Sequence, residues 1–421
     1  MKKMEPINVN TVIRYIHGRD RMELLIKNCR IVDETKDMKG DIYIKDGKIV
    51  DYGKSLDIDC KTIDGTKLVA MPSFIDMHAH FREPGYIYKE DLYTGGKAAL
   101  KGGYTCVNLM ANTHPICSSM EIVEYVLNKS KELDLIDIHQ TLSITKNFDG
   151  KTIDHLDQID PRVNFISDDG KGIQSNRTMY RAMVKAKEKD LTIIAHEEDE
   201  ELVSIDTRLS ENIMTFRDIY LTRLTGAKLH LAHVSTKEAI EEIRKAKKEG
   251  LKITCEVTPH HIALYDNEYK VNPPIRKKED VEAILKGIID GTIDIIATDH
   301  APHSKEDKEK GAPGISGLET AFSICYTALV RSGYISLNRL SQLMSATPGK
   351  LMGINKGKIK NGYDGDIVLV DLDKKEIIDE GNFQSKGKNT PFNKMGFYGK
   401  VVATIRKGEI KYNGGITVDN R

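Results

Sequence analysis

The sequence lacks three features that would place the protein in a membrane, nucleic-acid or disulfide class. No apolar stretch among its 421 residues approaches the ~18–20 residues of a membrane span, and residues 1–20 contain no continuous apolar segment of the signal-peptide kind. Basic and acidic residues both number 63, so a concentrated basic face for nucleic acid is not expected. Six cysteines without CxxC spacing indicate reduced, mostly buried thiols. We therefore expect a soluble, cytoplasmic globular protein.

The two ends of the chain have the composition of β structure. Residues 22–70 and 356–421 consist of short β-branched runs and turns, including an Asp46-Gly47 pair typical of a two-residue hairpin. We expect these ends to form one small β-sandwich module beside a middle domain at 71–355. Residues 1–21 form an N-terminal extension to which no role is assigned.

The middle of the chain alternates between buried-strand signals and amphipathic stretches. Eight short runs rich in β-branched residues recur there, and helical patterns between them cover 118–133, 176–190, 236–249 and 279–290. This alternation predicts an α/β fold in the form of a (β/α)8 TIM-like barrel, which commonly takes about 250 residues.

Polar side chains follow nearly every one of these runs. In a parallel barrel all strand C-termini open onto one face, so residues far apart in the sequence converge there. We expect this for His78, His80, Asn112, Asp168, Asp169, His196, His233 and Asp299.

The spacing of His78 and His80 suits a metal ion. Residues i and i+2 of a strand point to the same side, so both imidazoles can reach one point. Alone, the pair is equally well explained by two partly exposed polar residues near a turn, and His196 or His233 alone by a core histidine. Four histidines and two carboxylates at strand ends favour a site with nitrogen and oxygen ligands for Zn²⁺ or a similar divalent ion.

One carboxylate has to serve both ions if two metals bind. Asp169 is the candidate bridge, because Asp168 should face the opposite way and have a structural role. A carboxylated Lys171 is the weaker alternative for the same position.

Five motifs resemble those of the amidohydrolase superfamily and, within it, of dihydroorotases of the single-chain bacterial and archaeal type. HAHFREPG at 78–85 is similar to an HxHxREPG signature, and MANTHP at 110–115 to MPNTxP, with Ala111 in place of proline. NPPIR at 272–276, DHAPHSKEDK at 299–308 and GISGLET at 314–320 also match. The resemblance covers about residues 22–421. His260-His261 belongs to the resemblance as well, with an anchoring role rather than ligation.

This resemblance implies a metal arrangement of the aspartate-bridge type. His78 and His80 would hold one zinc with Asp299 beside it, His196 and His233 would hold a second, and Asp169 would bridge. One or two zinc ions are compatible with the type, with two favoured. Asp299 would also move the proton during catalysis.

The resemblance further implies a reversible reaction that interconverts N-carbamoyl-L-aspartate and dihydroorotate in pyrimidine biosynthesis. Arg82 would bind the substrate carboxylate in a bidentate manner. Asn112 and His303 would complete the carboxylate contacts, and Asn272 would hydrogen-bond the ring. The segment 303–317 would be either a mobile cover or an exposed loop.

Two other functions compete with this interpretation. Dihydropyrimidinases, hydantoinases and allantoinases share the fold and the HxH motif, but their substrates lack the carboxylate that Arg82 would bind. A catalytically silent structural relative is disfavoured, because all six ligand positions are filled. A homodimer and an association with aspartate carbamoyltransferase are both compatible with the resemblance.

Overall fold

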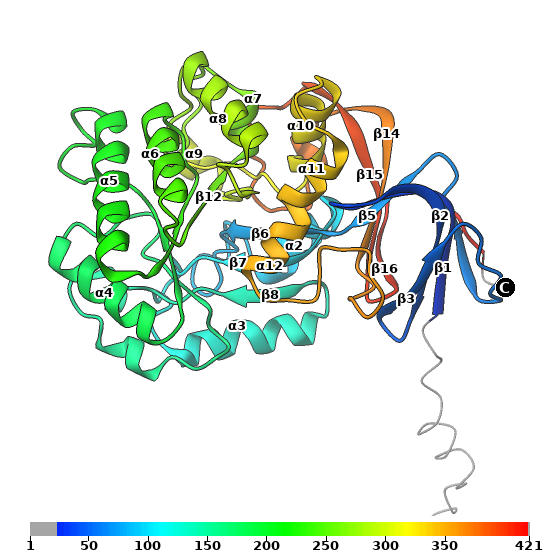
Figure 1. The fold of residues 1–421 in the computed structure, drawn as a ribbon, viewed down its shortest axis with the longest axis horizontal. Helices are drawn as coiled ribbons and strands as arrows, with labels where there is room; N and C mark the ends of the chain where they lie inside the picture. Colours follow the sequence, from blue (N-terminus) through cyan, green and yellow to red (C-terminus); the bar gives the residue numbers. More distant parts are fainter. Residues whose placement is uncertain (1–22, 420–421) are drawn as a thin grey trace, which may run out of the picture.

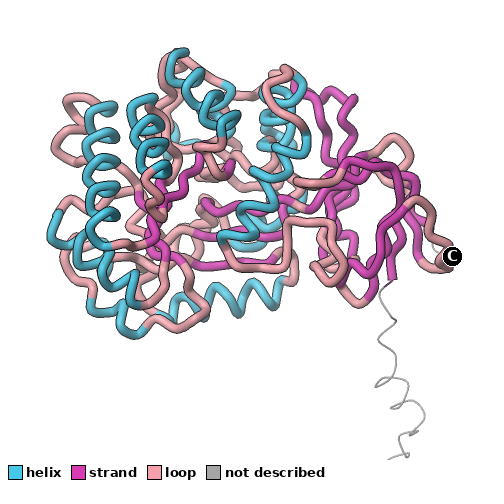
Figure 2. The backbone as a smooth tube through the Cα atoms, in the orientation of Figure 1, coloured by secondary structure: helices cyan, strands magenta, loops and turns pink. Residues whose placement is uncertain are grey.

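The computed structural model describes residues 23–419, and the extension predicted at 1–21 lies outside them. A large body of helices and short strands lies beside a curved β sheet (Figure 1), and the helices are concentrated in the large body (Figure 2). The α/β class and a sheet built from both ends of the chain are therefore present. No helix within 23–419 combines the length and the apolar character needed to cross a bilayer.

The sheet joins strands from both ends of the chain in the order β16-β15-β14-β5-β1-β2-β3, and β4 pairs with both β1 and β17. Its strands are β1 (Glu23–Val32), β2 (Asp37–Lys45), β3 (Lys48–Gly53), β4 (Lys61–Asp64), β5 (Val69–Pro72), β14 (Ile367–Ile377), β15 (Gly396–Arg406), β16 (Glu409–Asn413) and β17 (Val418–Asp419). Asp46 and Gly47 both have positive φ, 48° and 80°, as a two-residue hairpin turn between β2 and β3 requires.

Strand β1 divides the sheet into two parts. Its first half pairs with β4 at Leu24–Lys27 and its second half with β5 at Arg30–Ile31, with a register irregularity in the β1–β2 pairing between Ile26 and Cys29. The sheet closes around an apolar core that combines Ile26 and Ile63 with Ile367 and Ile405. Because each end of the chain supplies only part of this core, neither can bury its own apolar face alone.

The large body contains eight strands that run parallel in two sheets, β6-β7-β8 and β13-β12-β11-β10-β9. They are β6 (Phe74–Ala79), β7 (Tyr104–Leu109), β8 (Asp137–Gln140), β9 (Phe165–Ile166), β10 (Thr192–Ala195), β11 (Lys228–Leu231), β12 (Ile253–Val257) and β13 (Ile295–Ile296). Isolated parallel bridges join the sheets at both edges, Leu142 to Ile166 and Ala79 to His300. The backbone N–H of Thr298 also donates to Asp76 of β6 over 3.0 Å.

Helices follow most of these strands and cover their outer side (Figure 1). They are α2 (Leu92–Lys101), α3 (Met120–Leu133), α4 (Asn176–Glu188), α5 (Thr207–Thr225), α6 (Lys237–Lys248), α7 (Pro259–Ala263), α8 (Lys278–Asp290), α9 (Lys305–Glu309), α10 (Ala321–Cys325), α11 (Leu337–Ser341) and α12 (Thr347–Leu351). Short 3-10 turns lie at Lys146–Phe148, Asp154–Gln158 and Glu380–Asn382, and π-helical turns at Tyr326–Arg331 and Gln342–Ala346.

Four helices agree with the sequence patterns. The predictions at 118–133, 176–190, 236–249 and 279–290 match α3, α4, α6 and α8 to within two residues at each end. The 19-residue helix α5 was not predicted. Its outward face carries few of the charged residues that mark a solvent-exposed helix, so the usual amphipathic contrast is weak. The cysteines are all free, and five of the six are buried.

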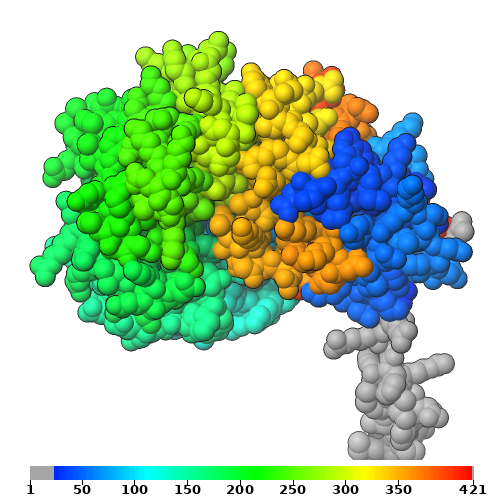
Figure 3. Space-filling view, viewed as in Figure 1, coloured from blue at the N-terminus to red at the C-terminus, as the bar shows by residue number. Residues whose placement is uncertain are grey.

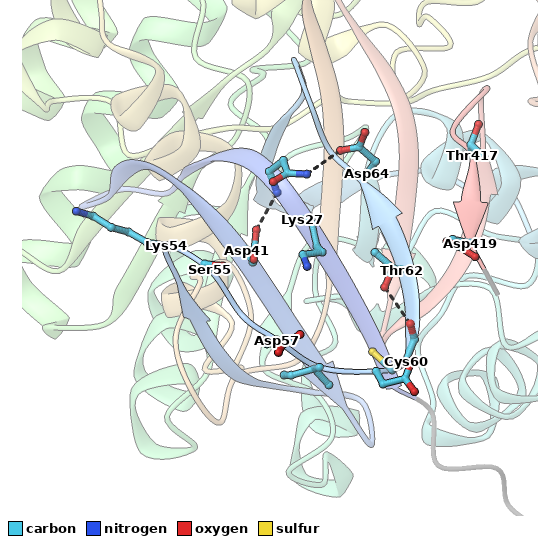
Figure 4. A pocket seen from close by; sticks show the side chains of 13 residues that line it. Lys27, Asp41, Lys54, Ser55, Asp57, Cys60, Thr62, Asp64, Thr417 and Asp419 are labelled. Carbon is cyan, nitrogen blue, oxygen red and sulfur yellow. Dashed lines mark hydrogen bonds between the residues drawn. The ribbon is translucent and has the colours of Figure 1, made fainter. Parts of the chain in front are cut away.

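A depression of about 700 Å³ lies in the sheet, among residues of β1, β2, β4 and the connection after β3 (Figure 4). The Asp41 carboxylate in it accepts hydrogen bonds from the backbone N–H groups of Asn28 and Leu56. The Asp64 carboxylate accepts from Asn28 and Thr66. These two carboxylates therefore stabilise the connections of the sheet.

A buried ion cluster joins the sheet to the parallel strands. The Lys356 ammonium contacts Asp366 and lies 2.7 Å from Asp137 at the start of β8 and 3.0 Å from Asp364. Arg406 of β15 binds Asp137 over 2.6 Å. Burial raises the pKa of Asp137, but Lys356 and Arg406 outweigh burial and hold the pKa below its usual value.

We expect Lys356→Met to lower the free energy of unfolding by about 3 kcal/mol, because removing one partner of a buried ion pair leaves charge uncompensated. Urea denaturation followed by circular dichroism measures the change. Lys350→Met at an exposed position of α12 is the matched control and should stay within about 0.5 kcal/mol of wild type. Equal free energies of unfolding for the two variants would contradict the stabilising role of Lys356 in the buried ion cluster.

Candidate metal centre and substrate cavity

The candidate ligands lie where the parallel strands end. His78 is on β6 and His80 directly follows it, and their ring centroids are 5.2 Å apart. His196 follows β10, and His233 lies two residues beyond the end of β11. Alternation along β6 and the residue after it turns His78 and His80 to one side.

Two ligand positions have backbone conformations that non-glycine residues rarely adopt. His233 has φ 32° and Asp299 has φ 46°. Such left-handed conformations cost on the order of 1 kcal/mol each and cluster at functional sites. Here they occur where the chain leaves the strand and the side chain turns towards the other ligands.

Asp169 lies at the centre of the group. Its Oδ1 atom is 3.4 Å from His78 Nε2, 3.3 Å from His196 Nδ1 and 3.6 Å from His233 Nε2. Its Oδ2 atom is 3.5 Å from His80 Nε2. Asp299 Oδ1 lies 3.1 Å from His80 Nε2 and 3.8 Å from His78 Nε2. The fold thus brings together all six residues that the sequence nominated.

This group suits a divalent cation. His78 Nε2 and Asp169 Oδ1 are buried and have no hydrogen-bond partner. Burial raises the pKa of Asp169, but the neighbouring imidazoles hold it well below its usual value, so the carboxylate stays ionised. Two sets have ligand atoms within 4.8 Å of one another: His78, His80 and Asp299, and His78, Asp169 and His233. Nitrogen and oxygen donors without sulfur match zinc and related ions.

The first set agrees with the arrangement that the resemblance implied, whereas the second departs from it. The second set contains His78 instead of His196. His196 presents Nδ1 towards the group, 3.0 Å from His233 Nε2, while its Nε2 atom lies 3.4 Å from the Asn272 amide nitrogen.

Glu256 orients His78 from behind. Its Oε1 atom lies 2.6 Å from His78 Nδ1, and its Oε2 atom lies 3.0 Å from His230 Nε2. Burial raises the pKa of Glu256, but His78 and His230 outweigh burial and lower it to about 2. The carboxylate therefore accepts from His78 Nδ1 and leaves Nε2 facing Asp169, a common support for a metal ligand.

Glu256 was not predicted from the sequence, although a signal was present. It stands alone in the buried strand ITCEV, and an ionised carboxylate is costly to bury without a partner. Asn112 was nominated for substrate. Its Oδ1 atom lies 2.8 Å from His80 Nδ1, so it supports a ligand ring as Glu256 does.

A cavity of about 190 Å³ opens beside these ligands. Arg82 donates from Nε to the Pro302 carbonyl over 3.3 Å, and its Nη2 atom lies 3.3 Å from His303 Nε2. Burial, with the charges of Arg82 and Lys89 added, lowers the pKa of His303 to about 3. The cavity lining includes all the nominated residues except His78: His80, Arg82, Asn112, Asp169, His196, His233, Asn272, Asp299 and His303.

Asn272 lines the cavity beside Glu198, a second residue that was not predicted from the sequence. Its amide nitrogen donates to Glu198 Oε2 over 2.7 Å. His261 Nε2 lies 3.0 Å from the Pro273 carbonyl and its Nδ1 atom lies 2.8 Å from Thr258 Oγ1. His261 therefore anchors the loop that presents Asn272.

The neighbours of Asp169 have other environments. The Asp168 carboxylate accepts from the backbone N–H groups of Ile144 and Thr145 over 2.7 and 3.0 Å, which is a structural role. Lys171 is exposed to solvent, so it does not occupy the bridging position. The alternative of a carboxylated lysine is therefore wrong for this residue.

Comparison with known proteins agrees with the geometry. The model of the amidohydrolase family matches residues 69–411. A dihydroorotase of Clostridium botulinum is 57% identical over 396 residues, covering 93% of this chain and 100% of the relative. A dihydroorotase of Thermoanaerobacter is 42% identical over 421 residues, covering 93% of this chain and 97% of the relative.

Solved structures share the fold at lower identity. The dihydropyrimidinase of Brevibacillus agri is similar with a TM-score of 0.84 at 23% identity, covering 94% of this chain and 96% of that chain. The L-hydantoinase of Arthrobacter aurescens has a TM-score of 0.85 at 25% identity, covering 94% and 98%. The sequence relatives are much closer, and they decide the assignment: the chain belongs to the amidohydrolase family and, within it, to the dihydroorotases.

Proposed function

We propose that the protein catalyses the reversible interconversion of N-carbamoyl-L-aspartate and (S)-dihydroorotate, the dihydroorotase reaction of pyrimidine biosynthesis. It is a hydrolase acting on a cyclic amide C–N bond. The observation that carries the proposal is Arg82 in the wall of the cavity that also contains His80, Asp169 and Asp299. This places a carboxylate-binding group next to a candidate metal centre.

We infer that the eight parallel strands form a closed (β/α)8 barrel over residues 71–355. The parallel bridges from Leu142 to Ile166 and from Ala79 to His300 support closure at both gaps. We infer that the β module predicted at 22–70 and 356–421 is sandwich-like, because the single sheet formed by its described residues, within 23–419, closes around one core. Active sites of such barrels lie at the strand C-termini, which is where the candidate ligands lie.

The ions proposed are Zn²⁺, with two per chain. His78 and His80 would hold one with Asp299, while His196 and His233 would hold the other, and Asp169 would bridge. Bound zinc would supply the Lewis acidity that activates water and polarises the amide carbonyl. Glu256 and Asn112 keep the imidazoles of His78 and His80 in place for this role.

Substrate binding rests on charge. The Arg82 guanidinium offers paired donors to the substrate carboxylate, and His303 lies beside it. The lowered pKa of His303 keeps its ring neutral at pH 7, so the histidine supplies a hydrogen bond rather than a second positive charge. Asn272, which also lines the cavity, donates to the ring, and Asn112 contributes chiefly through His80.

Asp299 carries the proton. As water attacks the ring carbonyl carbon, Asp299 accepts a water proton, and it then donates that proton to the ring nitrogen as the C–N bond breaks. Burial raises the pKa of Asp299, but His80 and neighbouring imidazoles lower it below its usual value. The group is therefore ionised and ready to accept a proton at the start of hydrolysis. The reverse sequence closes the ring and releases water.

Hydrolysis of dihydropyrimidines or hydantoins is the alternative, and the fold neighbours carry these names. Arg82 argues against it, because a half-buried guanidinium facing a neutral ring would lack an anionic partner. The alternative predicts that dihydrouracil or hydantoin is turned over faster than dihydroorotate.

The proposed partners are a small-molecule substrate and a second copy of the chain, in the cytoplasm, without nucleic acid or membrane. Association with aspartate carbamoyltransferase stays a prediction, and sedimentation of the two purified enzymes together tests it.

We expect Arg82→Met to reduce kcat/KM for dihydroorotate by roughly 100-fold, because losing one partner of a hydrogen-bonded charge pair costs about 2–5 kcal/mol. Steady-state assays measure the change, and zinc content should stay at the wild-type value. Lys171→Met is the control, because Lys171 is exposed to solvent. This variant should leave kcat, KM and the zinc content unchanged. Unchanged KM and kcat in Arg82→Met would remove the carboxylate assignment.

We expect Asp169→Asn to reduce the zinc bound per chain, because an amide is a weaker ligand than a carboxylate. Metal analysis of the purified protein after dialysis measures the stoichiometry. Asp168→Asn is the matched control. The Asp168 carboxylate is also buried and adjacent in sequence, but it accepts hydrogen bonds from Ile144 and Thr145 instead of facing the imidazoles. Equal zinc content in the two variants would rule out Asp169 as the bridge.

A further inference from the structure

An apolar stripe covers the outer face of α5. Its members are large hydrophobic residues that expose between 41% and 76% of their surface: Ile205, Leu209, Ile213, Phe216, Tyr220 and Leu224. Five lie on the helix, and Ile205 directly precedes its cap residue Asp206. Their spacing of four, four, three, four and four residues keeps them within an arc of about 100°.

Charged residues are nearly absent from this face. Among the residues of α5, the one exposed charged side chain is Arg223, which binds Glu249 over 2.8 Å. On the neighbouring helix α6 every exposed residue is charged: Lys237, Glu241, Lys245 and Lys248. Helices that face water carry such residues, so α5 departs from the pattern that the adjacent helix follows.

The flanks of the stripe are already engaged within the chain. Arg208 binds Asp280 over 2.7 Å and also contacts Glu238, and Arg217 binds Asp218 over 2.7 Å. These contacts hold the long cationic side chains to the body of the molecule and leave the apolar stripe uncovered.

The spacing of the stripe residues reads the same from either end of the helix. Reversal about the midpoint between Met214 and Thr215 exchanges Ile213 with Phe216. The same operation exchanges the outer positions, Leu209 with Tyr220 and Ile205 with Leu224. Two antiparallel copies of one helix packed about a two-fold axis need this property, since residue i of one copy meets residue j of the other and j meets i.

We propose that α5 is the interface of a homodimer in which the two copies of the helix pack antiparallel about a two-fold axis. This deepens the homodimer proposed above by naming its surface, and it is independent of the reaction proposed. In the dimer Ile213 of each copy packs on Phe216 of the other, and Leu209 on Tyr220.

The position and size of the stripe support a second copy as its occupant. Helix α5 lies at the edge of the molecule farthest from the β sheet (Figure 1), and the space-filling view shows its surroundings open to solvent at that edge (Figure 3). Six such side chains, about half exposed, present on the order of 500 Å² per copy. Two copies therefore bury about 1,000 Å² from the stripe alone, the lower bound of a specific interface.

We expect the wild-type chain to sediment as a dimer at micromolar concentration, and Phe216→Glu and Ile213→Lys each to sediment as monomers. Ile289→Glu is the matched control, since Ile289 is also an apolar helical residue, 56% exposed on α8, and this variant stays dimeric. Circular dichroism checks that each variant is folded. A monomeric wild type would overturn both the homodimer and its surface, whereas a dimeric Phe216→Glu would overturn the surface alone.

Mixing variants tests the register. Combining Ile213→Lys with Phe216→Glu brings the new ammonium against the new carboxylate in the mixed pair, so dimers return. Combining Ile213→Lys with Leu224→Glu places the new charges opposite Phe216 and Ile205, so that mixture stays monomeric. Recovery in both mixtures, or in neither, would overturn the antiparallel arrangement.

Discussion

The close approach of Asp169 to the imidazoles is the interaction on which the site depends. One carboxylate oxygen lies 3.3–3.6 Å from nitrogens of His78, His196 and His233. So many polar atoms can be buried together only if charges of opposite sign or a cation compensate them. The parallel strands make this possible, because five of them end near a single point and carry there, from positions far apart in the chain, the six candidate ligands.

Groups behind the ligands turn this cluster into a defined site. Glu256 receives a hydrogen bond from His78, and Asn112 receives one from His80, so the nitrogens opposite these bonds face the centre. Thr298 is tied through its backbone to Asp76 of β6, which holds the segment ending in Asp299 against the strand that carries the histidines. The ligands are thus fixed by bonds from other strands of the fold and from the segments that follow them, not only by their own loops.

Different regions of the fold carry different tasks. The strand ends hold the candidate metal and substrate residues, and the buried cluster around Lys356 ties the sheet to the opposite end of β8. The outer face of α5 lies away from both and contributes to neither, so apolar residues there can serve contact with a second copy without affecting the cavity. This separation lets binding chemistry and assembly be altered independently.

The sequence by itself determined the local elements and the residue types of the site. Periodicity located α3, α4, α6 and α8, because alternation and helical repeats are properties of neighbouring residues. The motif at 78–85 nominated His78, His80 and Arg82, because a motif is likewise a pattern of neighbouring residues. Tertiary structure alone revealed Glu256 as the partner of His78, 178 positions away, and turned His196 Nδ1 rather than Nε2 towards Asp169. It also decided that the apolar face of α5 is exposed. Contacts between distant residues depend on how strands and helices pack, and a periodic pattern specifies a face of one element but not what lies opposite it.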